Sequence, residues 1–317
     1  MPKILLVKTS SLGDVVHNLP VASDIRASLP EAEIAWVVEE AFAAIPRLHR
    51  AVARVIPVAI RRWRGALWRE GVRDEVRRFR EALRDTKYDA VIDSQGLLKS
   101  ALIARTARGW RIGLDWKSAR EPLALFYDRT FSVPRAGHAV ERNRKLAAQA
   151  LGYPIPACAD YGIRAEPGRF PWLPAERYAV LLHATSASAK LWPEASWRML
   201  GERLVERGMR CVLPWGNDAE RERSERLAAA IPDAIVPPML PLAEVSPLLA
   251  GAHAVIGVDT GLTHLGAALG RPTVGIYCAT DPAATGLYGS ARAANTGAVG
   301  RPPGVDHVIG ALDRVGA

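Results

Sequence analysis

The 317-residue sequence has no long hydrophobic run and very little cysteine. No run approaches the roughly 18 apolar residues that a membrane-spanning helix needs. The apolar run at the N-terminus is strand-sized and is not followed by a secretory cleavage pattern, so we expect a cytoplasmic protein. The three cysteines form no Cys-x-x-Cys pair and show no spacing to histidine that is typical of zinc sites. We therefore interpret Cys158, Cys211 and Cys278 as reduced, mostly buried thiols.

Three common ligand-binding motifs are also missing. The sequence contains no Gly-x-Gly, which excludes the dinucleotide fingerprint, and no Gly-Lys pair, which excludes the P-loop. It contains no Asp-x-Asp either, the carboxylate pair that holds a divalent metal on a sugar nucleotide. Isolated carboxylates could still bind a metal, but the expectation from these absences is a site with no metal and no cofactor.

Acidic residues are scarce in one half of the chain. Residues 1–165 contain 28 Lys and Arg against 18 Asp and Glu, which gives +10, whereas residues 166–317 contain 14 against 15. This asymmetry indicates a polyanionic partner for the first half, such as nucleic acid, an anionic membrane surface or a phosphorylated substrate. The alternative is that the basic half only keeps the protein soluble. No helix-turn-helix, RNP or zinc-finger signature is present, so we do not expect nucleic acid as the partner.

What the sequence does contain is a regular alternation of strand-like and helical segments, which is typical of parallel sheets covered by helices on both faces. A stretch rich in proline and glycine, residues 151–176, interrupts the alternation and is interpreted as a linker. We expect two doubly wound α/β domains, residues 1–165 and 166–317, that face a central cleft and bind ligands at the carboxyl ends of their strands. The expected strands are residues 3–7, 34–39, 54–59, 88–94 and 111–114, then 178–184, 210–215, 234–237, 254–259 and 272–278.

Helical periodicity supports the same organisation. The segment 14–29 contains Pro20, so this helix is expected to start late or to kink there. In the charged segment 69–85 the charges form a solvated face around an apolar stripe. That stripe consists of Val72, Val76, Phe79 and Leu83. The helices expected after the linker cover residues 194–207, 218–230, 242–250 and a segment that starts near 260.

The segment "VIGVDTGLTHLGAALG", residues 255–270, leads from an apolar strand to a helix start. Asp259 and Thr260 are good N-cap residues, and the helix is predicted to begin at Gly261. Free amides and the helix dipole favour a phosphate or pyrophosphate at this point. Gly261 lets the backbone approach such a ligand, and His264, one turn later, can reach the same anion. The alternative is an ordinary capped helix with His264 in solvent.

A second polar loop lies in "LLHATSASAKLWPEASW", residues 181–197, after a strand that ends at His183. Thr185, Ser186 and Lys190 all precede the next helix. A lone loop lysine is usually a surface residue, but opposite a helix N-terminus in the same domain it is a suitable partner for a diphosphate. The C-terminal domain is therefore predicted to hold a nucleotide diphosphate with hydroxyls, amides, one lysine and one histidine.

The first polar loop of the chain lies in "KTSSLGDVVHNLP", residues 8–20. If the C-terminal domain holds an activated nucleotide, this loop supplies the acceptor side. Asp14 would be a general base that takes a proton from an attacking hydroxyl, and Gly13 would allow the tight turn. The alternative, which spacing does not separate from the first, is that Asp14 only caps the following helix. Adaptable hydrogen bonds would come from Thr9, Ser10 and Ser11.

Seven segments carry a resemblance that runs through nearly the whole chain in order. They are "KTSSLGDVVHNLP", "WVVEEAF" (36–42), "VIPVAIRRWR" (55–64), "AVIDSQGLLKSAL" (90–102), "LDWKSAREPLA" (114–124), "LPWG" (213–216) and "GVDTGLTHL" (257–265). Together they resemble the ADP-heptose:lipopolysaccharide heptosyltransferases of Gram-negative inner-core assembly. The resemblance implies the two-domain GT-B fold and inverting transfer of L-glycero-D-manno-heptose from ADP-heptose to a Kdo residue of Kdo-lipid A. The alternative is another member, such as heptosyltransferase II, with the same donor and a different core acceptor.

The same resemblance implies roles for individual residues. Asp14 corresponds to the catalytic base. In the mechanism that we expect, Lys190, the helix N-terminus and His264 stabilise the departing ADP, as a metal does elsewhere. Glu220 corresponds to a ribose partner and Leu240 to the adenine contact, although a single gap would exchange Leu240 with Met239. The implied donor contacts are Thr185, Ser186, Lys190, Glu220, Leu240, Asp259, Thr260, Gly261 and His264.

A Kdo-lipid A acceptor carries carboxylates and phosphates, which accounts for the basic first half of the chain. Trp63 is expected either against sugar or lipid or in the core. We expect ADP-heptose and Kdo-lipid A as partners, a monomer, and a peripheral location on the cytoplasmic face of the inner membrane. The residues expected around the acceptor are Ser11, Gly13, Arg61, Arg62, Arg64, Lys99 and Arg120.

Overall fold

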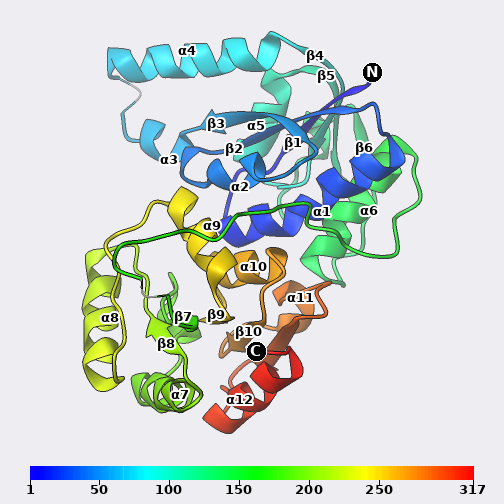
Figure 1. Ribbon diagram of the computed structural model, residues 1–317. Coiled ribbons are helices and arrows are strands. Elements are labelled where there is room, and N and C mark those ends of the chain that lie inside the picture. The colour runs from blue at the N-terminus through cyan, green and yellow to red at the C-terminus, as the bar shows by residue number, and fades with distance from the viewer. Residues whose placement is uncertain (67, 174) are drawn as a thin grey trace. The chain divides into compact units, whose positions relative to one another are not determined.

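The computed structural model describes residues 1–66, 68–173 and 175–317, and the chain divides into two compact units (Figure 1). The N-terminal unit is Met1–Ile163 and the C-terminal unit is Arg164–Ala317, so the division lies two residues before the expected boundary. Each unit has its own parallel sheet and its own hydrophobic core. Over the described residues, the search for a helix long and apolar enough to cross a membrane finds none.

The N-terminal unit is built on a six-stranded parallel sheet with the order β3-β2-β1-β4-β5-β6. Chain order runs one way from β1 to β3 and the other way from β4 to β6. The switch point, where ligands bind in such folds, therefore lies between the neighbours β1 and β4. The strands are β1 (Lys3–Val7), β2 (Glu33–Glu39), β3 (Val52–Val58), β4 (Lys87–Asp93), β5 (Arg108–Leu114) and β6 (Arg129–Phe131).

The first helix, α1 (Leu12–Ser28), begins earlier than the sequence suggested. Pro20 lies inside it, so the expected late start is wrong. The helix starts at Leu12 because Ser11 is its N-cap residue and forms a capping box with Asp14. Pro20 removes one helical hydrogen bond, but the surrounding turn is buried and packs against α6 (Ala139–Leu151), which offsets that loss.

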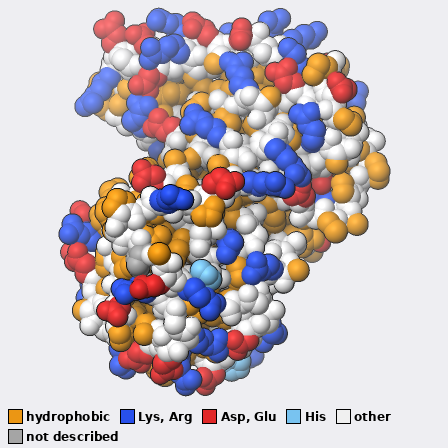
Figure 2. Space-filling view, viewed as in Figure 1, with side chains coloured by type: hydrophobic (Ala, Val, Ile, Leu, Met, Phe, Trp, Pro, Cys, Tyr) orange, Lys and Arg blue, Asp and Glu red, His pale blue; other side chains and the backbone are white. Residues whose placement is uncertain are grey.

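The charged segment forms α4 (Glu70–Arg84), as predicted. Val72 and Leu83 are buried, and Phe79 packs against the core from a half-buried position. In Figure 2 Lys or Arg and Asp or Glu side chains alternate over the upper edge of the molecule, where Figure 1 places α4, as expected for a solvated face. The other helical segments of this unit are η1 (Glu40–Phe42), α2 (Ala44–Arg47), α3 (Ile60–Trp63), α5 (Leu98–Thr106) and η2 (Ala124–Phe126).

The C-terminal unit has a five-stranded parallel sheet with the order β11-β10-β9-β7-β8, and its switch point lies between β7 and β9. The strands are β7 (Tyr178–Leu182), β8 (Arg210–Val212), β9 (Ala254–Val258), β10 (Thr273–Tyr277) and β11 (Ala293–Gly297). The strand expected at 234–237 is wrong: Ile235 forms an isolated bridge with Val212. The helical segments are η3 (Ser188–Lys190), α7 (Glu194–Glu206), α8 (Asp218–Ala230), α9 (Leu242–Gly251), α10 (Gly261–Ala268), α11 (Pro282–Thr285) and α12 (Val305–Arg314).

The cysteines are as the sequence predicted. All three lie among the described residues and are free thiols, with Cys211 and Cys278 buried and Cys158 exposed. Burial raises the pKa of the Cys211 thiol to about 12, so it stays protonated and unreactive at neutral pH.

Candidate active site

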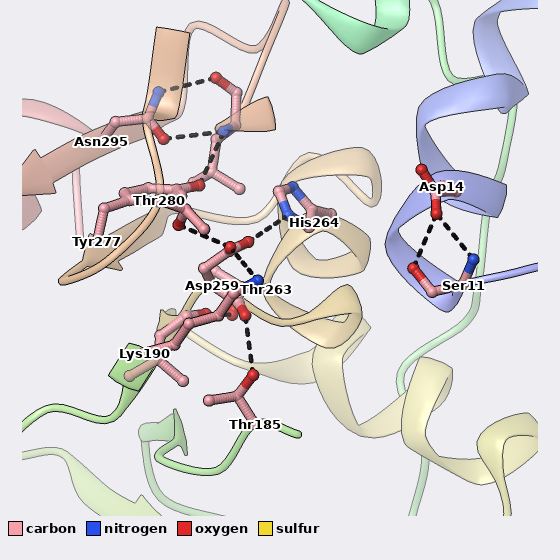
Figure 3. Close-up of polar contacts among 12 residues, drawn as sticks. Ser11, Asp14, Thr185, Lys190, Asp259, Thr263, His264, Tyr277, Thr280 and Asn295 are labelled. Carbon is pink, nitrogen blue, oxygen red and sulfur yellow. Dashed lines mark hydrogen bonds and ion pairs between the residues drawn. The ribbon is translucent and has the colours of Figure 1, made fainter. Parts of the chain in front are cut away.

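In the C-terminal unit, polar side chains converge on Asp259, which directly follows β9 (Figure 3). Lys190 Nζ donates to Asp259 Oδ2 at 2.7 Å, and Thr280 Oγ1 donates to the same oxygen at 2.8 Å. His264 Nε2 lies 3.4 Å from Asp259 Oδ1. Only 8% of Asp259 is exposed, so this carboxylate fixes three side chains around one buried point at the switch point of the sheet.

The electrostatics of this cluster keep Asp259 ionised. Burial alone would raise the pKa of its carboxyl, but hydrogen bonds from His264, Lys190 and Thr280 outweigh burial and hold that pKa well below its usual range. Asp259 is therefore a carboxylate at neutral pH, and it orients the Lys190 ammonium beside the start of α10.

The N-terminus of α10 is arranged for an anion. Thr260 is the N-cap residue, and within the described residues its hydroxyl makes no capping hydrogen bond, which leaves the first helical amides for a ligand. Behind them, Gly257 allows α10 to pack closely on β9. A Cβ at Gly257 would lie 2.1 Å from Thr263 Oγ1, which donates to the Val258 carbonyl at 2.8 Å.

The loop after β7 joins the same cluster. Thr185 Oγ1 donates to the Asp259 carbonyl at 3.2 Å, and Lys190 lies at the end of η3 in that loop. Ser186 lies in the same loop and is exposed. Of the predicted donor residues, the structure brings together Thr185, Lys190, Asp259, Thr260, Gly261 and His264.

The other predicted donor residues lie at the ends of neighbouring elements. Glu220 is in the first turn of α8, and its Oε2 accepts a hydrogen bond from the Gly216 amide at 2.9 Å. Met239 is 61% exposed and Leu240 is half-buried in the loop that leads to α9. Among the described residues, Glu220, Met239 and Leu240 make no direct contact with Asp259 of the kind that Lys190, His264 and Thr280 make.

Sequence reasoning missed Thr280, the third partner of Asp259. It follows β10 as Thr185 follows β7 and Asp259 follows β9, because parallel strands end at one edge of the sheet. A polar residue soon after the predicted strand 272–278 was the signal that could have revealed it.

In the N-terminal unit, a pocket at the switch point between β1 and β4 is lined by Asp14 and Arg120. Asp14 Oδ2 accepts hydrogen bonds from the Ser11 amide at 2.8 Å and from Ser11 Oγ at 3.0 Å. Asp14 therefore does cap α1, as one of its two predicted roles required, and it also lines the pocket. Ser11 donates both hydrogen bonds to Oδ2 of Asp14, so capping of α1 does not involve Oδ1.

Hydrogen bonds from the loop between β4 and α5 fix the backbone of the loop that precedes Asp14. Gln95 Oε1 accepts hydrogen bonds from the amides of Thr9 at 3.0 Å and Ser10 at 3.1 Å. Lys99 Nζ donates to Ser10 Oγ at 2.7 Å. Asp93 Oδ1 in turn accepts a hydrogen bond from the Gln95 amide at 2.9 Å. Sequence reasoning missed Gln95 and Asp93, although both lie in the segment 90–102 that carries part of the resemblance.

The pocket is positively charged as well as polar. Lys8, buried at the end of β1, donates from Nζ to the Ser94 carbonyl at 2.8 Å, and burial lowers its pKa. Arg142 on α6 lines the pocket beside Arg120, and burial together with the Arg120 charge lowers the pKa of its guanidinium. Lys8 and Arg142 were not predicted. A negatively charged ligand would relieve the repulsion between these cations.

Two of the arginines around Trp63 differ in how far their charge is available. Arg62 is paired through Nε and Nη2 with Glu40, at 3.1 Å for each contact, and through Nη1 with Glu75. The guanidinium of Arg61 lies 5.4 Å from the centre of the Phe42 ring and is exposed. Arg62 therefore has its charge compensated inside the unit.

Trp63 adopts the second of its two predicted roles. Its indole Nε1 donates to Glu75 Oε2 at 2.8 Å, and its ring centre lies 5.6 Å from that of Phe79. It packs from a half-buried position against the core of the N-terminal unit. Arg64, which follows α3, is exposed.

Comparison with known proteins identifies the family of the chain. The model of glycosyltransferase family 9 (heptosyltransferase) matches residues 76–306. The chain is 52% identical over 299 residues to lipopolysaccharide heptosyltransferase 1 of Pseudomonas aeruginosa, covering 92% of this chain and 82% of the relative. It is 50% identical over 290 residues to the protein of that name from Escherichia coli K12, covering 90% and 91%.

Solved structures of heptosyltransferases are also similar to this chain. The E. coli heptosyltransferase WaaC with ADP superimposes with a TM-score of 0.91 and 45% identity over 99% of both chains. The same enzyme with ADP-2-deoxy-2-fluoro heptose gives 0.84 and 47% over 94% of both chains. The E. coli ADP-heptose lps heptosyltransferase II, at 22% identity and a TM-score of 0.78, shares the fold. The protein has the GT-B fold of these glycosyltransferases, and its chain belongs to glycosyltransferase family 9, the heptosyltransferases.

Proposed function

We propose that this protein is a heptosyltransferase I that transfers L-glycero-D-manno-heptose from ADP-heptose to a Kdo residue of Kdo-lipid A, with inversion. The observation that carries the proposal is the cluster of Lys190, His264 and Thr280 on Asp259 beside the free end of α10. The relatives support type I over type II, because heptosyltransferase 1 of Pseudomonas aeruginosa and of E. coli K12 are 52% and 50% identical to this chain, whereas heptosyltransferase 2 of E. coli K12 is 24% identical.

The C-terminal unit would hold the donor. The diphosphate would lie on the amides of Gly261 and Leu262, between Lys190 and His264, with the Thr185 hydroxyl at its side. The charge on the departing ADP grows as the glycosidic bond breaks, so the ammonium and the helix dipole stabilise the transition state more than the ground state. Ser186 would add a hydroxyl contact, Glu220 would bind the ribose, and Leu240 or Met239 would contact the adenine.

The N-terminal unit would hold the acceptor and the base. Asp14 Oδ1 takes the proton from the attacking Kdo hydroxyl, whose oxygen forms the new bond to the anomeric carbon. The bond from that carbon to the ADP oxygen breaks, and the electron pair leaves with ADP through an oxocarbenium-like transition state. Ser11 keeps Asp14 in place through Oδ2 while Oδ1 does the chemistry, and Gly13 leaves room for the acceptor.

Acceptor carboxylates and phosphates would be bound by cations near Asp14. Arg120 lines the same pocket as Asp14, and Lys99 is tied to Ser10 in the adjoining loop. Lys8 and Arg142 add positive charge to that pocket, and Arg61 and Arg64 add it near the ends of β2 and β3. We propose that the enzyme works as a monomer on the cytoplasmic face of the inner membrane.

The test is a direct transfer assay. Incubation with ADP-heptose and Kdo-lipid A should yield a product heavier than the acceptor by one heptosyl residue, and should do so in saturating EDTA, because Lys190 and α10 offset the diphosphate charge. Transfer to a heptosylated acceptor but not to Kdo-lipid A would identify a type II enzyme instead. Loss of activity in EDTA with rescue by magnesium would contradict the metal-free donor site.

A further inference from the structure

Three leucine side chains on two adjoining helical segments of the N-terminal unit, α5 and η2, are exposed. Leu98 and Leu102 are 48% and 52% exposed on α5, and Leu125 in η2 is 84% exposed. Leu98, Leu102 and Arg105 are spaced by four and three residues, so they lie along one face of the helix. The buried face of α5, with Ala101 and Ala104, packs inward, which shows that the leucines are not needed for the core.

Segment η2 continues this surface because it packs beside α5. The backbone amide of Leu98 donates to Glu121 Oε2 at 2.6 Å, which ties the chain before η2 to the start of α5. The guanidinium of Arg105 lies 5.7 Å from the centre of the Phe126 ring. Leu98, Leu102, Arg105, Leu125 and Phe126 are called the α5–η2 face below.

The segment that contains the α5–η2 face has a net positive charge. Residues 98–129 contain seven Lys and Arg and three Asp and Glu. Asp128 and Arg111 form an ion pair and cancel each other, and Glu121 accepts the Leu98 amide, so the segment keeps its net positive charge. Exposed leucines among cations are the composition of a surface that lies in the headgroup region of an anionic bilayer, where apolar area and positive charge both contribute to binding.

We infer that the α5–η2 face docks on an anionic phospholipid bilayer, with Leu98, Leu102 and Leu125 among the headgroups and Arg105 on lipid phosphates. The biological purpose, though not the contact itself, rests on the proposed lipid-linked acceptor. Lys99 is on α5, and Arg120 is in the segment that leads to η2. Docking therefore brings the cations proposed for the acceptor next to the membrane in which that acceptor is anchored.

Sedimentation with acceptor-free vesicles of phosphatidylethanolamine and phosphatidylglycerol tests the contact. The double variant Leu102→Gln/Leu125→Gln should bind these vesicles at least roughly tenfold more weakly, since two leucine side chains lose their burial. Arg105→Gln should weaken binding further, and added salt should mimic it. Met199→Gln, at a residue 49% exposed on α7 of the other unit, is the matched control and should bind like the wild type.

Unchanged vesicle binding by the double variant would overturn the inference. So would a wild-type dimer in sedimentation velocity that the double variant abolishes, because the face would then be an interface between two copies. The double variant should also transfer heptose normally to a deacylated acceptor in solution and about tenfold more slowly to Kdo-lipid A in vesicles. If the wild type transferred to neither acceptor while the vesicle result held, the proposed function would fail and the docking surface would stand.

Discussion

At the scale of single residues, the two carboxylates of the site are used in different ways. Asp259 is saturated with donors and stays ionised as a scaffold for Lys190 and His264. Asp14 has its two hydrogen bonds from Ser11 on one oxygen. A carboxylate with three donors is a poor base, since those hydrogen bonds stabilise its charged form. The geometry therefore favours Asp14 for proton transfer and Asp259 for orientation.

The variant Asp14→Asn separates the base from the cap. Asparagine retains an oxygen that can accept the Ser11 amide, so the melting temperature should stay near that of the wild type. The proton acceptor is lost, so kcat should fall on the order of 10²–10⁴-fold, with affinity for ADP-heptose unchanged. Ser11→Ala is the control: it removes the Oγ donor and weakens the cap by about 1 kcal/mol, but the amide of residue 11 still holds Asp14 Oδ2, so most of kcat should remain. Wild-type turnover in Asp14→Asn would reduce Asp14 to a capping residue.

Replacement of Lys190 should affect binding and chemistry together. In Lys190→Ala the diphosphate loses a cation and Asp259 loses its ion pair, so ADP should bind about tenfold more weakly, as expected for one charged hydrogen bond. The kcat should fall as well, because the ADP charge grows in the transition state and Lys190 stabilises that state more than the bound donor. Calorimetric titration with ADP and single-turnover kinetics measure the two effects. Weaker ADP binding with an unchanged kcat would mean that Lys190 only binds the donor.

At the scale of elements, the sequence located candidate site residues where polar side chains follow a predicted strand. Asp14, Thr185 and Asp259 were predictable in this way. Gln95 and Thr280 were missed because their importance depends on which strands are neighbours, and strand order is not visible in local periodicity. The expected strand at 234–237 failed for a similar reason: β8 ends at Val212 and offers Ile235 a single bridge.

A substitution at Gln95 tests whether contacts between neighbouring strands position the catalytic loop. Gln95→Met removes the oxygen that holds the amides of Thr9 and Ser10, so the loop before Asp14 should shift. Small shifts of a catalytic group are costly, and kcat should fall about 10–100-fold while the KM for ADP-heptose stays constant. Gln149→Met on the exposed face of α6 is the matched control. A drop in melting temperature with no change in kcat would make Gln95 a purely structural residue.

A buried histidine links β7 to α8 and makes that link sensitive to pH. His183 Nε2 lies 2.8 Å from Ser224 Oγ, and burial, followed by the Arg223 charge, lowers the pKa of His183 to about 4. Between pH 4 and 6.5 the unfolded chain then binds more protons than the folded one, so this contribution to stability is complete above pH 6.5 and is lost as the pH falls.

The variant His183→Gln cannot titrate in this range. The difference in unfolding free energy between wild type and His183→Gln should therefore shrink by about 2 kcal/mol from pH 7 to pH 5. Urea unfolding at the two pH values measures this difference, and contributions from other groups cancel in the comparison. A difference that is independent of pH would show that His183 is already charged in the folded protein.

At the scale of the whole molecule, the cations of the basic first half differ in how far they are engaged in ion pairs. The net charge of the first 165 residues is +10; among their cations, Arg62 is paired with Glu40 and Glu75, and Arg144 is paired with Asp24. Arg61 and Arg64 are exposed on either side of Trp63. The sequence therefore gives the net charge of the basic half, and the ion pairs in the structure identify which of its cations are already engaged inside the unit.

This distinction predicts unequal effects from neighbouring arginines on the acceptor KM. Each cation near an anionic surface contributes about 1 kcal/mol, so Arg61→Gln/Arg64→Gln should raise the KM for Kdo-lipid A roughly 30-fold. Arg62→Gln is the matched control in the same turn, and it should change that KM less than about threefold because its charge is already paired. The KM for ADP-heptose should hardly change in either variant, and added salt should reduce the difference between wild type and the double variant. An Arg62→Gln effect as large as that of the double variant would mean that the acceptor displaces Glu40 and Glu75 from Arg62. A rise in the KM for ADP-heptose alone would mean that Arg61 and Arg64 bind the donor and not the acceptor.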